Sequence, residues 1–319
     1  MAGQVSPIPT RMSPTEARLA VHVARLYFLD DMPKNAIAVQ LGLSRFKVAR
    51  LIDRARAEGL VTITFASPDG IDRQLSARLA ATLGLETVLV ADPVHPSVAV
   101  AAAAETAVSH LAAVTTEDSV LGLTWSRSAG FITEQLEALP PCTVVQLLGV
   151  LPRPDQEEQS LDLVRRAARA CGGTPVTFYA PLLVPDASTA TNLRATGGIA
   201  DAVATFDRVT TAVLAVGHWR PGSSTVFDHL DRHEADTLTR RGAVAETSGL
   251  LIDADGNVLP DALQDRTIAI SEAQLRAVPE VVGVATEPER APAIRALARS
   301  GLIHTLVTHR AVAERLLGA

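Results

Sequence analysis

Residues 33–51 read PKNAIAVQLGLSRFKVARL, a pattern typical of two short helices joined by a tight turn. A small side chain at Ala38 lets two helices approach closely, Gly42 permits the turn, and Val48 is an apolar residue that can pack back onto the first helix. Ser44 is a suitable N-cap for the second helix because its hydroxyl can accept a hydrogen bond from that helix's first turn. The spacing therefore predicts a helix-turn-helix.

The side chains of this segment divide into an apolar and a polar set. The apolar set is expected to form a small core: Ile37, Leu41, Leu43, Val48, Leu51 and Ile52. The polar set is expected to project from the second helix, whose first turns enter the major groove of DNA in a helix-turn-helix. The DNA-binding residues predicted from this are Ser44, Arg45, Phe46, Lys47, Arg50 and, more suited to a phosphate, Arg54. A solvated basic helix in an ordinary bundle is the alternative.

Charge is distributed unevenly along the chain. Its 319 residues carry a net charge of −6, yet residues 11–66 contain nine Lys or Arg against five Asp or Glu. The remaining residues contain 20 basic and 30 acidic side chains. A basic N-terminal fifth before an acidic remainder is expected if only the first part binds a polyanion.

The sequence predicts four segments: a flexible N-terminus at residues 1–12, a helix-turn-helix domain at 13–66, a linker at 67–70 and a larger domain at 71–319. Residues 13–16 read SPTE, a capping box that opens a first helix. Residues 60–65 alternate as in a short strand, which would make the first domain a winged type.

After residue 70, apolar strand-like runs alternate with helical stretches. Runs such as ETVLVA, TVVQLLGV, RTIAIS and EVVGVAT are apolar on both faces, which is typical of buried parallel strands. We expect a doubly wound, mostly parallel α/β sheet with helices on both sides, and a hairpin around residues 255–256.

Several classes of protein are disfavoured. Two cysteines make no disulfide framework in a chain of this size, and the N-terminus lacks the apolar region of a secretory signal. The Ala-rich run at residues 98–114 is interrupted by polar residues and suits a core helix better than a membrane span. A cytoplasmic protein without membrane contact is expected.

The chain resembles the SorC/DeoR-type sugar-binding bacterial regulators. The resemblance covers nearly the whole sequence and lies in the order of several segments: 23–61, GLTWSRSAG at 122–130, VVQLLG, AVLAVG, GAVAETSGLLIDADG at 242–256, and 278–317. It implies a DNA-binding headpiece before a sugar-binding domain related to sugar-phosphate isomerases. It further implies transcription control by a small, usually phosphorylated sugar, and a tetramer.

Effector-binding residues are expected at the carboxyl ends of strands, where open α/β sheets bind ligands. The segment TWSRSAG follows a strand and starts a helix, so its hydroxyls and backbone N–H groups could hold an anion. Candidates there are Thr124, Trp125, Ser126, Arg127 and Ser128, with Gly149 and Gly217 at two further strand ends. A capped turn with Arg127 in solvent is the alternative reading, and each glycine alone is more often only a turn residue.

Two further candidates rest on the resemblance. Glu246 stands where the family has an acidic residue that binds sugar hydroxyls. Arg290 stands at the lysine of the family's Gly-Gly-x-x-Lys-Ala phosphate segment, while Thr286 and Glu287 replace the two glycines. His309 stands where Asp is usual. Trp219 could stack on a sugar or pack in the core.

The sequence therefore predicts a non-enzymatic regulator whose affinity for double-stranded operator DNA is set by a sugar or sugar phosphate. A palindromic operator would require a homodimer or homotetramer. Since residues 67–319 contain no lysine, the effector cannot be held as a Schiff base. The main alternative is an isomerase-like enzyme using Glu246, Asp253 or His309, and a second is an α/β domain used only for assembly. No cofactor or metal is expected, because His229 and His233 are more typical of a solvated helix and DADGN at 253–257 of a turn.

Overall fold

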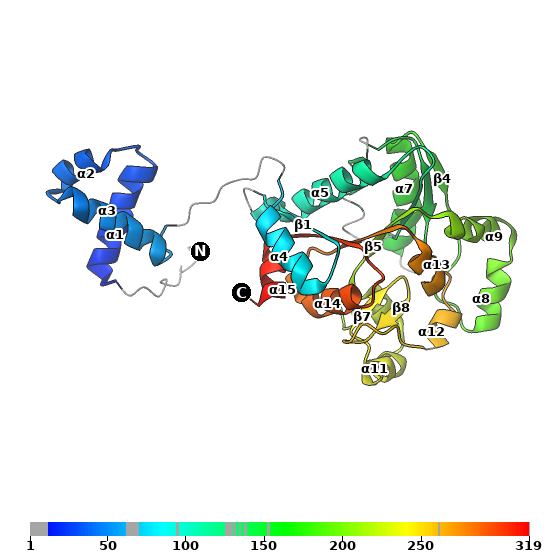
Figure 1. The fold of residues 1–319 in the computed structure, drawn as a ribbon. Helices are drawn as coiled ribbons and strands as arrows, with labels where there is room; N and C mark the ends of the chain where they lie inside the picture. Colours follow the sequence, from blue (N-terminus) through cyan, green and yellow to red (C-terminus); the bar gives the residue numbers. More distant parts are fainter. Residues whose placement is uncertain are drawn as a thin grey trace. The chain divides into compact units, whose positions relative to one another are not determined.

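The protein divides into two compact units, Met1–Phe65 and Ala66–Ala319 (Figure 1). This computed structural model describes residues 12–61, 70–93, 96–124, 130, 132–133, 135–136, 139–151, 154–260 and 262–318. Most of the expected strand at 60–65, the expected linker and nearly all of the expected flexible N-terminus lie outside these residues.

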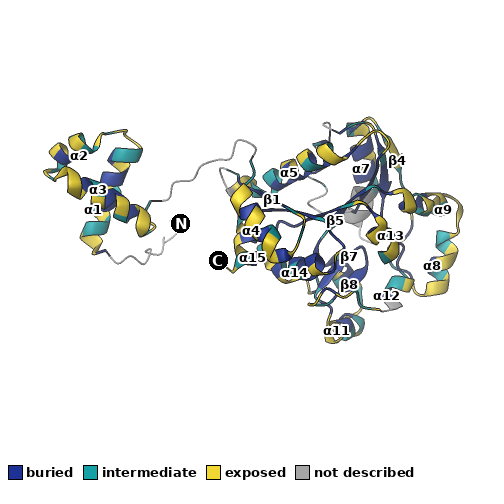
Figure 2. Cartoon of the chain, viewed as in Figure 1, coloured by how far each residue is buried: buried dark blue, intermediate teal, exposed yellow. Residues whose placement is uncertain are grey.

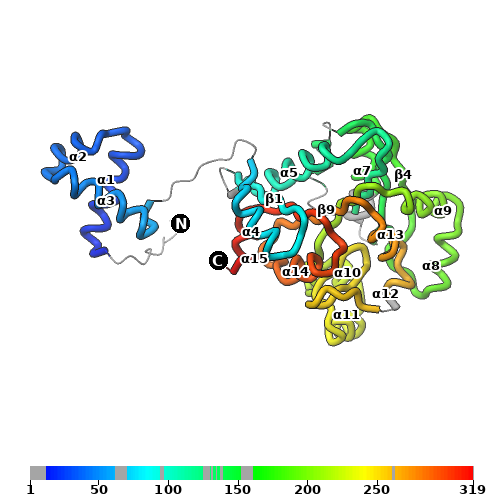
Figure 3. Tube along the Cα trace, viewed as in Figure 1, coloured from blue at the N-terminus to red at the C-terminus, as the bar shows by residue number. Residues whose placement is uncertain are grey.

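The described residues of the first unit form three helices, which Figure 3 follows along the chain: α1 (Pro14–Phe28), α2 (Lys34–Leu41) and α3 (Arg45–Ala57). Ser13 caps α1, because its hydroxyl accepts a hydrogen bond from the Glu16 backbone N–H at 3.3 Å. The three helices share one small core, to which each contributes buried aliphatic side chains, among them Val23, Ile37 and Leu51.

The turn between α2 and α3 depends on a glycine. Gly42 has φ +63°, in the left-handed region that glycine enters without strain. The next residue, Leu43, donates its N–H to the Ala38 carbonyl at 2.9 Å and closes the end of α2. Ala38 and Val48 are both buried against the neighbouring helices. The predicted roles of these residues in the turn are confirmed.

The second unit is built on a sheet of seven strands in the order β1-β10-β9-β5-β2-β3-β4, with every pairing among them parallel. The strands are β1 (Thr87–Ala91), β2 (Val120–Leu123), β3 (Thr143–Gln146), β4 (Thr174–Val176), β5 (Thr211–Ala215), β9 (Glu280–Val284) and β10 (Thr305–His309). The predicted mostly parallel α/β sheet is confirmed.

Helices cover both faces of this sheet, and the apolar residues of the strands alternate between two cores. One face packs against α5 (Ala99–Val114) and α7 (Pro154–Ala170). The other packs against α4 (Arg73–Leu83), α14 (Ala291–Arg299) and α15 (Arg310–Leu317). Figure 2 shows buried residues on the strands and exposed residues on the outer faces of the helices. No helix in the described ranges combines the length and apolarity required to cross a membrane.

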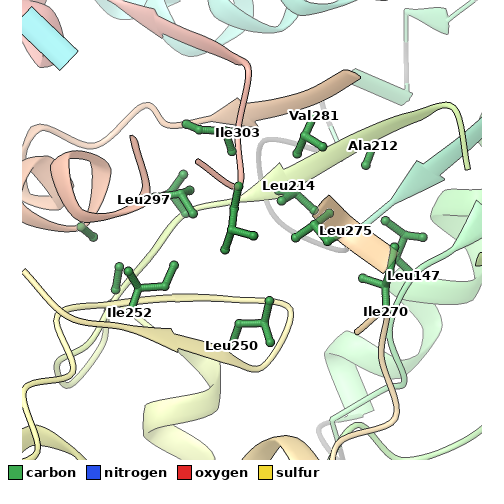
Figure 4. Packing of buried hydrophobic residues seen from close by; sticks show 14 of the residues in the cluster. Leu147, Ala212, Leu214, Leu250, Ile252, Ile270, Leu275, Val281, Leu297 and Ile303 are labelled. Atoms are coloured by element: carbon green, nitrogen blue, oxygen red, sulfur yellow. The ribbon is translucent and has the colours of Figure 1, made fainter. Parts of the chain in front are cut away.

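A small antiparallel sheet lies on the second face. Its strands are β6 (Gly217–His218), β7 (Ala245–Thr247) and β8 (Leu250–Ile252), in that order. Leu250 and Ile252 share a core with Leu214 of β5 (Figure 4). The remaining helices of the described residues are α8 (Ala187–Arg194), α9 (Gly197–Ala204), α10 (Thr225–His229), α11 (Arg232–Arg240), α12 (Ala262–Asp265) and α13 (Glu272–Ala277), with short 3-10 turns at Pro96–Val98, Phe206–Arg208 and Pro288–Arg290.

Two expected strands differ in the structure. The RTIAIS segment at 266–271 forms only isolated antiparallel bridges, Leu183↔Thr267 and Leu148↔Ala269, because its partners lie outside the strands of the parallel sheet. The hairpin expected around residues 255–256 is also reduced to one bridge, Ile252↔Val258, closed by Asp253, whose carboxylate accepts the N–H groups of Asp255 and Asn257 at 2.9 Å.

Candidate functional site

The outward face of α3 carries the basic residues predicted from the sequence. Arg45, Lys47 and Arg50 are exposed, and Phe46 is 87% exposed between the first two. The opposite face of the helix, with Val48, is buried in the three-helix core. The first turns of α3 thus present to solvent three cations that can bind phosphates or base edges and one aromatic ring that can contact a thymine methyl group.

The other two residues of the predicted DNA-binding set have structural partners. The Ser44 hydroxyl accepts a hydrogen bond from the Lys47 backbone N–H at 3.2 Å and so caps α3. The Arg54 guanidinium forms an ion pair with Glu16 of α1. The sequence did not predict this pair, which holds two of the three helices together. This ion pair gives Arg54 a structural role within the unit that does not depend on DNA binding.

In the second unit, the order of the strands reverses between β2 and β5. The chain continues from β2 to β3 on one side and from β5 to β9 on the other. Ligands of open α/β sheets bind outside the carboxyl ends of the strands at such a point. Thr124 follows β2 there, but its hydroxyl donates to the Val213 carbonyl at 3.2 Å and accepts from the Ala215 N–H at 3.0 Å. Its proton therefore links β2 to β5, and the predicted role of Thr124 in effector binding stays a prediction.

Glu246 lies beside this point, on the central strand of the small sheet. Its Oε1 accepts a hydrogen bond from the Gly249 N–H at 2.9 Å, and its Oε2 accepts one from the Ser224 hydroxyl at 3.2 Å. Burial raises the pKa of the Glu246 carboxyl, while these two hydrogen bonds and the charge of Arg290 oppose the increase. A buried carboxylate of this kind is a strong acceptor for hydroxyl groups.

Close contacts leave no room for a Cβ atom at either of the two predicted strand-end glycines. A Cβ atom on Gly217 would lie 2.9 Å from Oε2 and 3.0 Å from the carbonyl oxygen of Glu246. A Cβ atom on Gly149 would lie 2.7 Å from the carbonyl oxygens of Ala180 and Pro181. Gly217 therefore belongs to the surroundings of Glu246, whereas Gly149 is explained by backbone packing away from that carboxylate.

Arg290 is already engaged within the protein. Its Nε lies 3.3 Å from Oε2 of Glu287, its Nη2 donates to Oε1 at 3.3 Å, and its Nη1 donates to the Val216 carbonyl. The resemblance to the regulator family predicts Arg290 at a phosphate site. In the structure its charge is balanced by Glu287, and only its Nη1 points to the end of β5.

Trp125, Ser126, Arg127 and Ser128 lie outside the described residues. Trp219 is buried, with its ring 5.1 Å from that of Phe227 and its Nε1 donating to Thr239, so it packs in the core.

The helix surface on which His229 and His233 would have formed a metal site is divided in the structure. His229 ends α10 and His233 lies in α11, with the two helices separated by a break at residues 230–231. Among the residues for which the structure gives positions, no group of three or more His, Cys, Asp or Glu side chains could hold a metal ion.

Sequence reasoning missed Ser224 as a partner of Glu246. Ser224 is the N-cap of α10 and lies 22 residues before Glu246 in the chain, so no local pattern joins the two. It also missed the contact of His309, whose Nε2 lies 2.7 Å from the Thr286 carbonyl oxygen at the ends of β10 and β9.

A family model for a sugar-binding domain matches residues 70–318, which is most of the chain and nearly all of the second unit. The protein belongs to this sugar-binding domain family. The resemblance to SorC/DeoR-type regulators is thereby confirmed. Similar curated proteins also align with the first unit of this family member. The sorbitol operon regulator of Klebsiella pneumoniae is 23% identical over 315 residues, which cover 95% of this chain and 98% of that protein.

Two further comparisons extend the likeness. The erythritol catabolism regulatory protein EryD of Brucella abortus is 26% identical over 319 residues, covering 96% of this sugar-binding family member and 98% of the relative. The crystal structure of full-length SorC from Klebsiella pneumoniae matches with a TM-score of 0.71 at 22% identity, over 95% of this chain and 99% of that one. The structural match shows the shared fold across both units.

Proposed function

We propose that this protein is a transcriptional regulator that binds operator DNA through α3 and responds to a sugar-class effector at the carboxyl ends of β2 and β5. The observation that carries the proposal is the division of α3 into a buried apolar face and an exposed face with Arg45, Phe46, Lys47 and Arg50. In this proposal α2, the Gly42 turn and α3 form a helix-turn-helix, with α3 as the reading helix.

The second unit supports the sensing half of the proposal. It belongs to a family of sugar-binding domains, and its strand order reverses beside the buried carboxylate of Glu246. Sugars present hydroxyl donors, which such a carboxylate can accept. Effector binding there would change operator affinity by a coupling free energy on the order of 1–3 kcal/mol.

Two identical reading helices would match a palindromic operator, so we also propose that the active form is at least a dimer. The curated relatives are named as regulators of operons or of catabolism, which supports the regulatory role.

The geometry favours a regulator over the isomerase-like alternative. Asp253 closes an exposed turn, His309 contacts a backbone carbonyl, and Glu246 accepts from Ser224 and Gly249. Each of the three candidate catalytic groups thus has a separate partner. A general acid–base pair requires both groups within reach of the same bound substrate.

The test is selection of bound sequences from random duplex DNA by the full chain, followed by gel-shift titration of the enriched site. The double variant R45A/K47A should lose specific binding. The control R18A/R25A removes the same charge from exposed positions on α1 and should retain most of the affinity. Equal affinity of R45A/K47A and wild type for the selected site would refute the assignment of α3 as the reading helix.

A further inference from the structure

The turn between β7 and β8 contains a buried hydroxyl that the fold does not use. Ser248 is 8% exposed, and its Oγ has no hydrogen-bond partner. Ser248 and Gly249 have φ values of +53° and +79°, the combination required by a two-residue hairpin turn. Glycine or asparagine suits the first of these positions better than serine, so turn geometry alone does not explain the choice of Ser248.

Contacts on both sides hold this turn at the point where the strand order reverses. The Thr247 hydroxyl donates to the Ala215 carbonyl at the end of β5, at 2.9 Å. On the other side of Ser248, the Gly249 N–H donates to Glu246. The unpartnered hydroxyl is therefore fixed close to the same edge of the sheet as the buried carboxylate.

A second buried oxygen without a partner belongs to the same edge. Gln146 is the last residue of β3, next to β2, and is 1% exposed. Its Nε2 donates to the Leu148 carbonyl at 2.8 Å, which leaves Oε1 without a donor. In the described part of the chain one other buried side-chain oxygen lacks a partner, Thr115 Oγ1, and it lies before β2 at the opposite edge.

Two described cations near this edge already have acidic partners. Arg290 pairs with Glu287. Arg310, which follows β10, forms ion pairs with Asp72 at 2.8 Å and Asp92 at 2.9 Å. Other described polar groups at this edge include the carboxylate of Glu246, the amide oxygen of Gln146 and the hydroxyl of Ser248.

These three groups favour one chemical class of ligand. A carboxylate and an amide oxygen only accept hydrogen bonds, and a serine hydroxyl can donate or accept. A sugar hydroxyl supplies the donors that they require, whereas a phosphate dianion offers acceptors and adds charge beside a carboxylate.

We propose that Ser248 and Gln146 are effector-binding residues, and that the effector is an uncharged sugar or polyol without a phosphate group. Effector hydroxyls donate to Gln146 Oε1 and Glu246, and another exchanges a hydrogen bond with Ser248. This inference rests on the proposed function, since it names the ligand of the same sensing site.

The experiment is a thermal-shift and calorimetric titration of the full chain with two panels. The neutral panel contains erythritol, sorbitol, ribose and glucose, and the phosphorylated panel contains ribose 5-phosphate and glucose 6-phosphate. A member of the neutral panel should raise the melting temperature of the wild type, since a ligand that binds the folded state stabilises it.

The S248G variant should then bind that ligand with about tenfold lower affinity, as expected for the loss of one buried hydrogen bond. Without ligand, its melting temperature should equal or exceed that of the wild type. Glycine adopts the positive φ without strain, and it has no hydroxyl that would be buried without a partner. T115V removes the other unpartnered oxygen and should leave ligand affinity unchanged.

Each alternative result has a distinct meaning. Stabilisation by the phosphorylated panel alone would overturn the proposal that the effector is uncharged but leave the proposed function intact. Unchanged affinity of S248G, or a clear loss of its stability without ligand, would overturn the role of Ser248. A wild type stabilised by neither panel would overturn both this inference and the sensing half of the proposed function, while the selected-DNA test would still decide DNA binding.

Discussion

Arg290 and Glu287 face each other across one turn, with Nε of the arginine 3.3 Å from Oε2 of the glutamate. The two residues lie in the segment in which related proteins are expected to hold a phosphate. Arg290 is the one cation of that segment, and the carboxylate of Glu287 balances its charge. The position of Glu287 therefore bears directly on which ligands the protein accepts.

Replacing Glu287 with glutamine should create affinity for phosphate. The variant leaves Arg290 with an unbalanced charge while keeping an oxygen that can accept from Thr286, as Glu287 does at 3.3 Å. Inorganic phosphate should then raise the melting temperature of E287Q by about 2–4 °C for each kcal/mol of binding energy. The double variant E287Q/R290M is the control and should show no such rise. A wild type that already responds equally to phosphate would contradict the argument.

Glu246 should make stability depend on pH in a defined direction. Because burial raises the pKa of its carboxyl, the folded protein binds this proton more tightly than the unfolded chain does. The stabilisation is complete below the ordinary glutamate pKa of about 4.3 and is lost as the pH rises through the higher folded-state value.

The measurement is chemical denaturation of wild type and E246Q at a series of pH values. The free energy of unfolding of the wild type minus that of E246Q should fall as the pH increases from acid to neutral. A difference that grows with pH would mean that hydrogen bonds and Arg290 outweigh burial.

Replacing Gly217 with alanine should destabilise the second unit. The added Cβ would lie 2.9 Å from Oε2 and 3.0 Å from the carbonyl oxygen of Glu246, and overpacking of this kind costs about 1–3 kcal/mol. Gly198 in α9 is a matched control, since a Cβ there meets nothing within 4 Å. G198A should be neutral or stabilising by up to about 1 kcal/mol, measured by urea denaturation.

Salt dependence should separate Lys47 from Arg54. If Lys47 contacts a DNA phosphate, K47A should reduce the slope of log affinity against log salt by about one. R54A should leave the slope unchanged, because Arg54 pairs with Glu16, and should lower stability by about 0–1 kcal/mol, as expected for a partly exposed pair. Gel-shift titrations at several salt concentrations provide the measurement, and equal slopes for K47A and wild type would contradict the contact.

The elements that sequence predicted well are those fixed by neighbouring residues. Ser44 as a cap, Gly42 as a turn and the buried runs of the parallel strands all depend on local backbone chemistry or on a short hydrophobic period. The partners that sequence missed are distant in the chain: Arg54 is 38 residues from Glu16, and Ser224 is 22 from Glu246.

The candidate site shows the same division. Glu246 could be identified from the resemblance to the regulator family, but the use of Thr124 to link β2 and β5 depends on which strands become neighbours. The importance of Ser248 depends on burial without a partner, a property that has no sequence signature.

The packing of Trp219 has a spectroscopic consequence. The chain contains two tryptophans, and this one lies two residues after Gly217, with its indole held by Thr239 and Phe227. The backbone at Gly217, which lies against Glu246, thus leads within two residues to the buried, firmly held indole ring of Trp219. Its emission offers an intrinsic optical signal through which events at the carboxylate can be followed in the unlabelled protein.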